Sequence, residues 1–166
     1  EEFQSNSDNE WLESEDRLDI GGTETVRAWE YYDSYLPDSW RYVGLYHRIL
    51  YGGEYRVPLH PQMLWVVAFF DAGSLWSDSY WEEKLINSTY SEYVSEDLAS
   101  GKLRRIDDIT KGDLLPYFIY SYGFGIKLQV PMMPLRFWFG KKMIYDDGFK
   151  TISGYNFQFS IGDIRY

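Results

Sequence analysis

The chain has 166 residues, enough for one ordinary domain, and a formal net charge of -10 at pH 7. This acidic balance argues against nucleic acid or anionic lipid headgroups as main partners. The absence of cysteine excludes disulfides, thiolate metal sites and cysteine nucleophiles. No run of about 18 apolar residues occurs, so we expect no transmembrane helix. The chain begins at Glu1 without an initiator Met, and we expect it to be a piece of a longer protein.

Aromatic residues make up 20% of the chain, with 16 Tyr and 7 Trp. Aromatic girdles at the two interfaces of a membrane β-barrel would account for this content. A soluble carbohydrate-binding β-domain is also rich in Trp and Tyr. Composition therefore leaves a membrane barrel and a soluble β-sandwich both open.

The first 41 residues read mainly as loop. Residues 1–19 are acidic and polar, with a short helix at 10–16 as a weak alternative. Gly21 and Gly22 then allow a tight backbone path, and residues 25–29 favour an extended stretch with Arg27 at its centre. From the residues alone, the favoured interpretation is a surface hairpin with Arg27 in solvent.

Residues 42–58 alternate in a way that predicts a β-strand. One face carries mostly apolar side chains, and the other carries Arg48, Glu54 and Arg56, which a barrel would place in its lumen. A short turn is expected at 58–61. Neither His47 nor His60 accompanies a nucleophile motif, so a hydrolase reading is weak.

Residues 63–76 form a nearly continuous apolar segment that contains one carboxylate, Asp71. A carboxylate buried there without a partner would cost several kcal/mol. We therefore expect a partner, and an Arg is the natural bidentate one. Because both faces of this segment are apolar, something is expected to pack against its inner face.

Residues 77–111 are the longest irregular region, with short helices at 81–86 and 93–99 as alternatives. A loop of this length within a compact domain is usually functional or mobile. The adjacent Glu82 and Glu83 point apart, so a catalytic carboxylate pair is not expected. We expect no enzyme activity, no metal and no cofactor.

Residues 120–142 predict a long hairpin. From Tyr120 to Val130 large apolar side chains alternate with Ser, Gly, Gly, Lys and Gln, and after a turn at 131–134 the alternation resumes. The first strand has about ten to eleven residues, the length a tilted strand needs to cross a bilayer. Strands of soluble sandwiches are usually nearer five or six residues. A lipid face and a wet lumen would suit the two sides.

A turn at 146–148 precedes a last strand at 155–162, in which Phe157, Phe159 and Ile161 alternate with polar residues. The chain thus predicts an all-β antiparallel meander of about five strands. Short turns lie at one end and long loops at the other, an asymmetry typical of outer-membrane barrels.

Four motifs resemble the BamA family of outer-membrane assembly factors, in that family's order. Residues 21–27 read Gly-Gly-Thr-Glu-Thr-Val-Arg, 70–76 read Phe-Asp-Ala-Gly-Ser-Leu-Trp, 123–131 read Gly-Phe-Gly-Ile-Lys-Leu-Gln-Val-Pro, and 157–162 read Phe-Gln-Phe-Ser-Ile-Gly. The resemblance covers nearly the whole chain. It implies the C-terminal portion of a sixteen-stranded transmembrane β-barrel. Residues 1–41 would be the sixth extracellular loop region, residues 42–166 the last strands, and 77–112 a further acidic extracellular loop.

The resemblance also implies roles for individual residues. Val26 and Arg27 match the tip of a loop that folds back into the lumen, where the Arg pairs with acidic wall residues matching Glu54 and Asp71, and Gly73 belongs to the Phe-Asp-x-Gly wall motif. The family usually has Gly where this chain has Ala28. A second set of positions matches the lateral gate and the C-terminal assembly signal: Phe157, Phe159, Gly162 and Tyr166.

The implied function is a factor of the bacterial outer membrane that folds and inserts other barrel proteins beside its last strand, without a cofactor. Implied partners are unfolded outer-membrane proteins, lipoproteins of the assembly complex and outer-membrane lipids, but not nucleic acid. A piece with open sheet edges is expected to cover them by self-association. Two alternatives stay open: a related transporter that secretes a partner protein through its lumen, and a soluble carbohydrate-binding β-sandwich.

Overall fold

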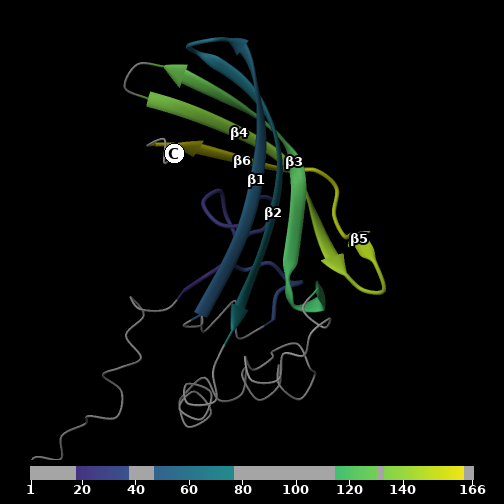
Figure 1. Ribbon diagram of the computed structural model, residues 1–166. Coiled ribbons are helices and arrows are strands. Elements are labelled where there is room, and N and C mark those ends of the chain that lie inside the picture. The colour runs from purple at the N-terminus through teal and green to yellow at the C-terminus, as the bar shows by residue number, and fades with distance from the viewer. Residues whose placement is uncertain (1–17, 38–46, 77–114, 131–132, 163–166) are drawn as a thin grey trace, which may run out of the picture.

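The described part of the chain folds as one antiparallel β-sheet of six strands. The computed structural model describes residues 18–37, 47–76, 115–130 and 133–162 (Figure 1). The strands are β1 (His47–His60), β2 (Leu64–Trp76), β3 (Ile119–Val130), β4 (Met133–Tyr145), β5 (Phe149–Thr151) and β6 (Asn156–Ile161), with one 3-10 turn, η4 (Leu115–Tyr117). Each strand from β1 to β4 pairs with the next, as a meander requires.

The last two strands pair with the same neighbour, β4. Strand β5 pairs with residues 143–145, and β6 pairs with residues 135–140. They are therefore two parts of one interrupted strand, and the prediction of an all-β meander of about five strands is confirmed. Strands β1 to β4 are 12 to 14 residues long, which is ample for a tilted strand to span a bilayer.

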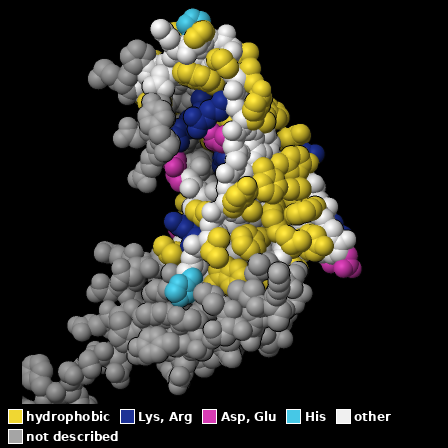
Figure 2. Space-filling model, in the orientation of Figure 1, with side chains coloured by type: hydrophobic (Ala, Val, Ile, Leu, Met, Phe, Trp, Pro, Cys, Tyr) yellow, Lys and Arg dark blue, Asp and Glu magenta, His cyan; other side chains and the backbone are white. Residues whose placement is uncertain are grey.

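The two faces of the sheet differ in chemistry, as the alternation predicted. On the outer face large apolar side chains are exposed, for example on β1, β3 and β6: Tyr51, Tyr55, Tyr122, Phe124, Phe157 and Phe159. Figure 2 shows hydrophobic side chains gathered over the outer side of the curved sheet and charged side chains in its hollow. An exposed apolar face of this extent suits lipid better than water.

Residues 18–37, purple in Figure 1, lie against the inner face of the sheet. Val26 and Trp29 are fully buried there, and Arg27 is 6% exposed. The segment consists mainly of turns, with no strand between residues 19 and 37. The expectation of a surface hairpin with a solvated Arg27 is therefore wrong, because the wall that covers the motif is formed by strands far away in the sequence.

The turns predicted at 58–61 and 131–134 are shorter than expected, because the strands beside them continue further. Strand β1 continues past Pro58 to His60, with an irregular register between these residues, and the turn lies at 61–63. At the next hairpin Pro134 pairs with Gln129, so β4 already includes this proline. The turn at 146–148 is confirmed, and Gly148 adopts φ +129° there.

Several expectations fall outside the described residues. These are the helices considered at 10–16, 81–86 and 93–99, and the whole of the long loop at 77–111. Within the described residues, no helix is long and apolar enough to cross a membrane.

The inner face of β3 tolerates no side chain at Gly123. A Cβ there would lie 2.1 Å from the backbone oxygen of Phe139 on the neighbouring strand. We therefore expect Gly123→Ala to lower the free energy of unfolding by roughly 1–3 kcal/mol, the usual effect of overpacking. Urea unfolding followed by tryptophan fluorescence checks this value.

Gly53→Ala on β1 is the matched control, because a Cβ at Gly53 meets no atom within 4 Å. It is expected to leave stability unchanged or slightly higher, since Ala restricts the unfolded chain. Equal destabilisation by the two substitutions would contradict the close approach of β3 and β4.

Candidate functional site

Arg27 lies at the centre of a charged site on the inner wall. Its Nε and Nη2 atoms donate to the two carboxylate oxygens of Asp71 on β2, each at 2.6 Å. Its Nη1 donates to Oε1 of Glu54 on β1 at 2.5 Å, and its backbone N–H donates to Asp71 Oδ2 at 3.2 Å. The expected contact between Arg27 and Asp71 is thus present and bidentate, the strongest arrangement for such a pair.

Two aromatic rings enclose the same guanidinium. The carbon Cζ of Arg27 lies 4.0 Å from the ring centre of Phe69 and 4.4 Å from that of Trp138. These two rings meet edge to face at 5.5 Å. The planar cation therefore gains cation–π attraction in a site where water is largely excluded.

Burial alone lowers the pKa of the Arg27 guanidinium, but the hydrogen bonds and charges of Asp71 and Glu54 outweigh burial and raise the pKa. Arg27 therefore stays charged. The exposed fractions of the two side chains are only 8% for Arg27 and 4% for Asp71. Loss of either partner would strand a buried charge.

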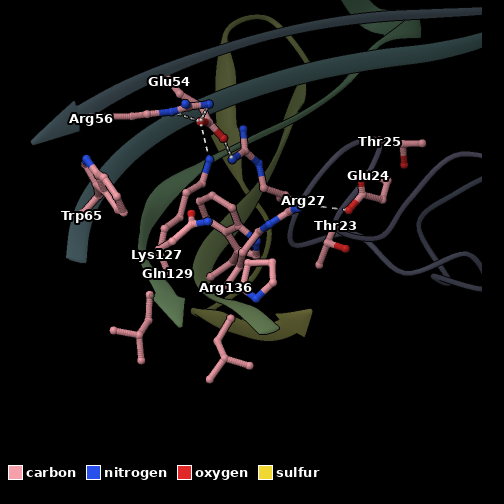
Figure 3. Close-up of a pocket in the computed structure, with 14 residues that line it drawn as sticks. Thr23, Glu24, Thr25, Arg27, Glu54, Arg56, Trp65, Lys127, Gln129 and Arg136 are labelled. Atoms are coloured by element: carbon pink, nitrogen blue, oxygen red, sulfur yellow. Dashed lines mark hydrogen bonds and ion pairs between the residues drawn. The ribbon is translucent and has the colours of Figure 1, made fainter. Parts of the chain in front are cut away.

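Glu54 connects this pair to a second group of cations. Its Oε2 accepts from Arg56 Nε and from Lys127 Nζ, each at 2.8 Å (Figure 3). Lys127 lies directly opposite Arg136 in the register of β3 and β4. Like charges in that position repel each other. Glu54, and Glu24 at 3.3 Å from Arg136, offset this repulsion.

A cavity of about 350 Å³ lies beside these cations. Loop residues 23–25 and Arg27 form part of its wall, and the strands supply Trp65, Lys127 and Arg136 among others. The site is therefore a polar hollow between the loop and the sheet.

The loop can approach the wall closely because small residues stand beneath it. A Cβ at Gly73 would lie 2.6 Å from side-chain atoms of both Ile20 and Val26. A Cβ at Gly140 would lie 2.8 Å from the Cβ of Ala28. Both predicted motif residues, Val26 and Gly73, are thus brought together by the fold.

Ala28 adopts the left-handed conformation, with φ 72°. Glycine adopts it readily, whereas an L side chain there costs roughly 1–2 kcal/mol. The Gly that the resemblance implies at this position would adopt this conformation without that cost. In this chain the surrounding contacts hold the strained backbone, including a bond from Trp29 Nε1 to the Tyr120 carbonyl at 2.8 Å.

Two inner-wall residues that sequence reasoning missed also hold the loop. Gln158 on β6 bonds to the backbone at Ala28 and Trp29, and Lys142 on β4 forms an ion pair with Asp33. Their parity on the strands predicts that they point inward. No pattern in the sequence indicates which loop atoms they meet.

The expected gate residues lie on or next to β6. Phe157 and Phe159 point outward and are 58% and 45% exposed. Gly162 follows the strand with φ +148° and donates its N–H to the Pro134 carbonyl at 3.3 Å. Tyr166 lies outside the described residues. The loop motif thus docks on the inner face of the sheet, Phe157 and Phe159 point outward from β6, and Gln158 joins β6 to the loop.

The chemistry of this site is that of docking. Within the described residues, no three His, Cys, Asp or Glu side chains gather in a way that would hold a metal ion. The charged side chains instead form ion pairs with one another, as Arg27 does with Asp71 and Glu54. The site is built to hold a loop against a wall.

Arg27→Ala is expected to weaken loop docking by about 3–5 kcal/mol, because it leaves the Asp71 carboxylate buried and unpaired. Hydrogen exchange of amides in residues 20–29 measures this change. The control is Lys150→Ala, which removes an exposed ion pair with Asp146 worth at most about 1 kcal/mol. Unchanged exchange in the Arg27 variant would contradict the docking role of the pair.

Ala28→Gly is expected to stabilise the domain by about 0.5–1 kcal/mol. The strain energy relieved at the left-handed backbone exceeds the entropic cost of the more flexible unfolded chain. Ala68→Gly, on an exposed and regular part of β2, is the matched control and should destabilise the domain by a similar amount. Denaturant unfolding of both variants tests the opposite signs, and the same sign for both would refute the strain at position 28.

The whole chain was also compared with known proteins. The sequence model of the Omp85 superfamily domain matches residues 2–164. A comparison with curated proteins found no match. Members of the superfamily are outer-membrane β-barrel proteins that act in protein insertion or transport. A curved antiparallel sheet with an apolar outer face and a loop docked on its polar inner face agrees with that architecture, and the chain belongs to the Omp85 superfamily.

Proposed function

We propose that this chain is the C-terminal part of the barrel of a BamA-type assembly factor, which folds and inserts other β-barrel proteins beside its last strand. The observation that carries the proposal is the short length of β6 at an open edge. This strand has six residues, fewer than any of β1 to β4, and pairs with β4 on one side. Its other edge, like the outer edge of β1, has no partner among the described residues.

An open strand edge has a specific use in a membrane. Unpaired N–H and C=O groups in lipid cost several kcal/mol each, so a substrate strand cannot enter alone. An exposed edge offers those groups hydrogen-bond partners by strand addition. A short gate strand that pairs weakly lowers the barrier to this exchange.

The docked loop would keep the lumen wall rigid while the edge exchanges partners. In this proposal residues 1–41 belong to an extracellular loop, residues 42–166 to the barrel strands, and 77–112 to a second extracellular loop. The barrel would lie in a bacterial outer membrane. Its partners would be unfolded outer-membrane proteins, accessory lipoproteins and the surrounding lipids.

A transporter of the same superfamily is the second candidate. The polar inner face and the cavity near Arg136 favour it, because a secreted chain needs a wet path. The soluble carbohydrate-binding sandwich has less support, since the described strands form one sheet rather than two stacked sheets.

Insertion in liposomes tests the proposal. The complete protein that carries this domain is reconstituted, a urea-unfolded outer-membrane barrel is added, and protease-protected product is followed over time. Faster folding than in empty liposomes is the expected result. No acceleration, combined with export of a co-supplied partner chain into the lumen of the vesicles, would support the transporter instead.

Gly162 provides a matched pair for this assay. Gly162 and Gly148 both have positive φ and open space around an added Cβ. Ala at either position should therefore cost a similar backbone strain of roughly 1–3 kcal/mol. We expect only Gly162→Ala, beside the gate strand, to slow insertion severalfold, and equal rates for the two variants would count against a gate at this position.

A further inference from the structure

We propose that Gln158 is a positioning residue that couples loop docking to the pairing of the last strand. Its side chain lies on β6, the strand nearest the chain's C-terminus in the sheet. The Ala28 N–H donates to Gln158 Oε1 at 2.9 Å, and Gln158 Nε2 donates to the Trp29 carbonyl at 3.0 Å. One amide thus satisfies a donor and an acceptor of adjacent loop residues.

A primary amide of this length meets both requirements of the loop backbone. The Ala28 N–H needs an acceptor, and the Trp29 carbonyl, which also accepts from the Gly22 N–H at 2.8 Å, takes Gln158 as a second donor. These two bonds fix the orientation of the amide group. The left-handed backbone at Ala28 presents the two groups to the same side chain. A carboxylate would keep the acceptor and lose the donor, and a thioether would lose both.

The consecutive loop residues 27–29 also contact the strands at the other end of the sheet. Arg27 bonds to Glu54 on β1 and Asp71 on β2, and Trp29 bonds to the Tyr120 carbonyl on β3. Through Gln158 they also reach β6. Among the described strands, β6 connects to β1 along the sheet through β4, β3 and β2. The loop therefore makes a direct link between the charged site and the gate strand.

This link adds to the pairing with β4 and to the packing of Phe157 and Phe159 on Phe137 and Phe139, which also hold β6. The strand shares six paired positions with β4, from Leu135 opposite Ile161 to Gly140 opposite Asn156. Two further hydrogen bonds from the loop add to that pairing. When the loop leaves the wall, β6 loses them and frays more readily from β4. The role of this fraying rests on the proposed function. In that function, a loosened gate strand would favour exchange with an incoming strand.

Hydrogen exchange on the complete protein in detergent micelles or nanodiscs tests the coupling. Gln158→Met removes both bonds and keeps the side-chain length. We expect amides of β6 to exchange about tenfold faster, the effect of losing one to two net hydrogen bonds. Amides of β5, which also pairs with β4, should be unchanged. The matched control is Ser160→Ala, on the same face of β6, whose hydroxyl has no hydrogen-bond partner in the described part of the chain.

Coupling must be reciprocal. Gln158→Met should also speed exchange at residues 27–29, and Arg27→Ala should speed exchange in β6. In the double variant the two effects on β6 should not add, because both break the same link. Full additivity, or unchanged β6 exchange in either single variant, would overturn the proposal.

A further variant covers the case in which Gln158→Met does not fold. Gln158→Glu keeps the acceptor for Ala28 and loses the donor to Trp29, so β6 exchange should rise less than in the Met variant. Exchange equal to the unmodified protein would overturn the coupling. The liposome assay stays separate: coupled exchange without insertion activity would refute the proposed function alone, and insertion without coupled exchange would refute this inference alone.

Discussion

One buried cation, Arg27, determines how the interior of this domain is arranged. Its guanidinium donates hydrogen bonds to Asp71 and Glu54 and lies against two aromatic rings. A buried ion pair contributes to stability only when its geometry and hydrogen bonding are nearly complete. That requirement fixes the height and orientation of the loop, and the neighbouring contacts of Val26, Ala28 and Trp29 follow from it.

The wall is shaped to receive that loop. Glycines at positions 73 and 140 leave room where the loop backbone descends, and a side chain at either would collide with it. Larger inner-face residues contact the loop directly, as Trp138 does at Arg27 and Gln158 does at Ala28. Loop and wall are therefore complementary in volume as well as in charge, which explains why Gly and Trp share the inner face of adjacent strands.

The outer face obeys a different constraint. Superfamily members reside in outer membranes, where a barrel presents apolar side chains to lipid. The same strands that hold charges inward expose Phe124, Phe157 and Phe159 outward. In β6 these two demands meet: aromatic side chains face lipid, and Gln158 faces the loop. A change in the loop can thus reach the apolar outer face of the sheet through a single strand.

The sequence by itself determined the strands, their two faces and the need of Asp71 for a cationic partner, because a period of two and the cost of a lone buried carboxylate are local properties. The resemblance of its motifs added the identity of that partner. Only the tertiary structure decided that residues 25–29 form a buried turn, that Ala28 is left-handed and that Gln158 and Lys142 hold the loop. Parity states which face a side chain occupies, whereas contacts between residues more than a hundred positions apart depend on how the sheet curves around the loop.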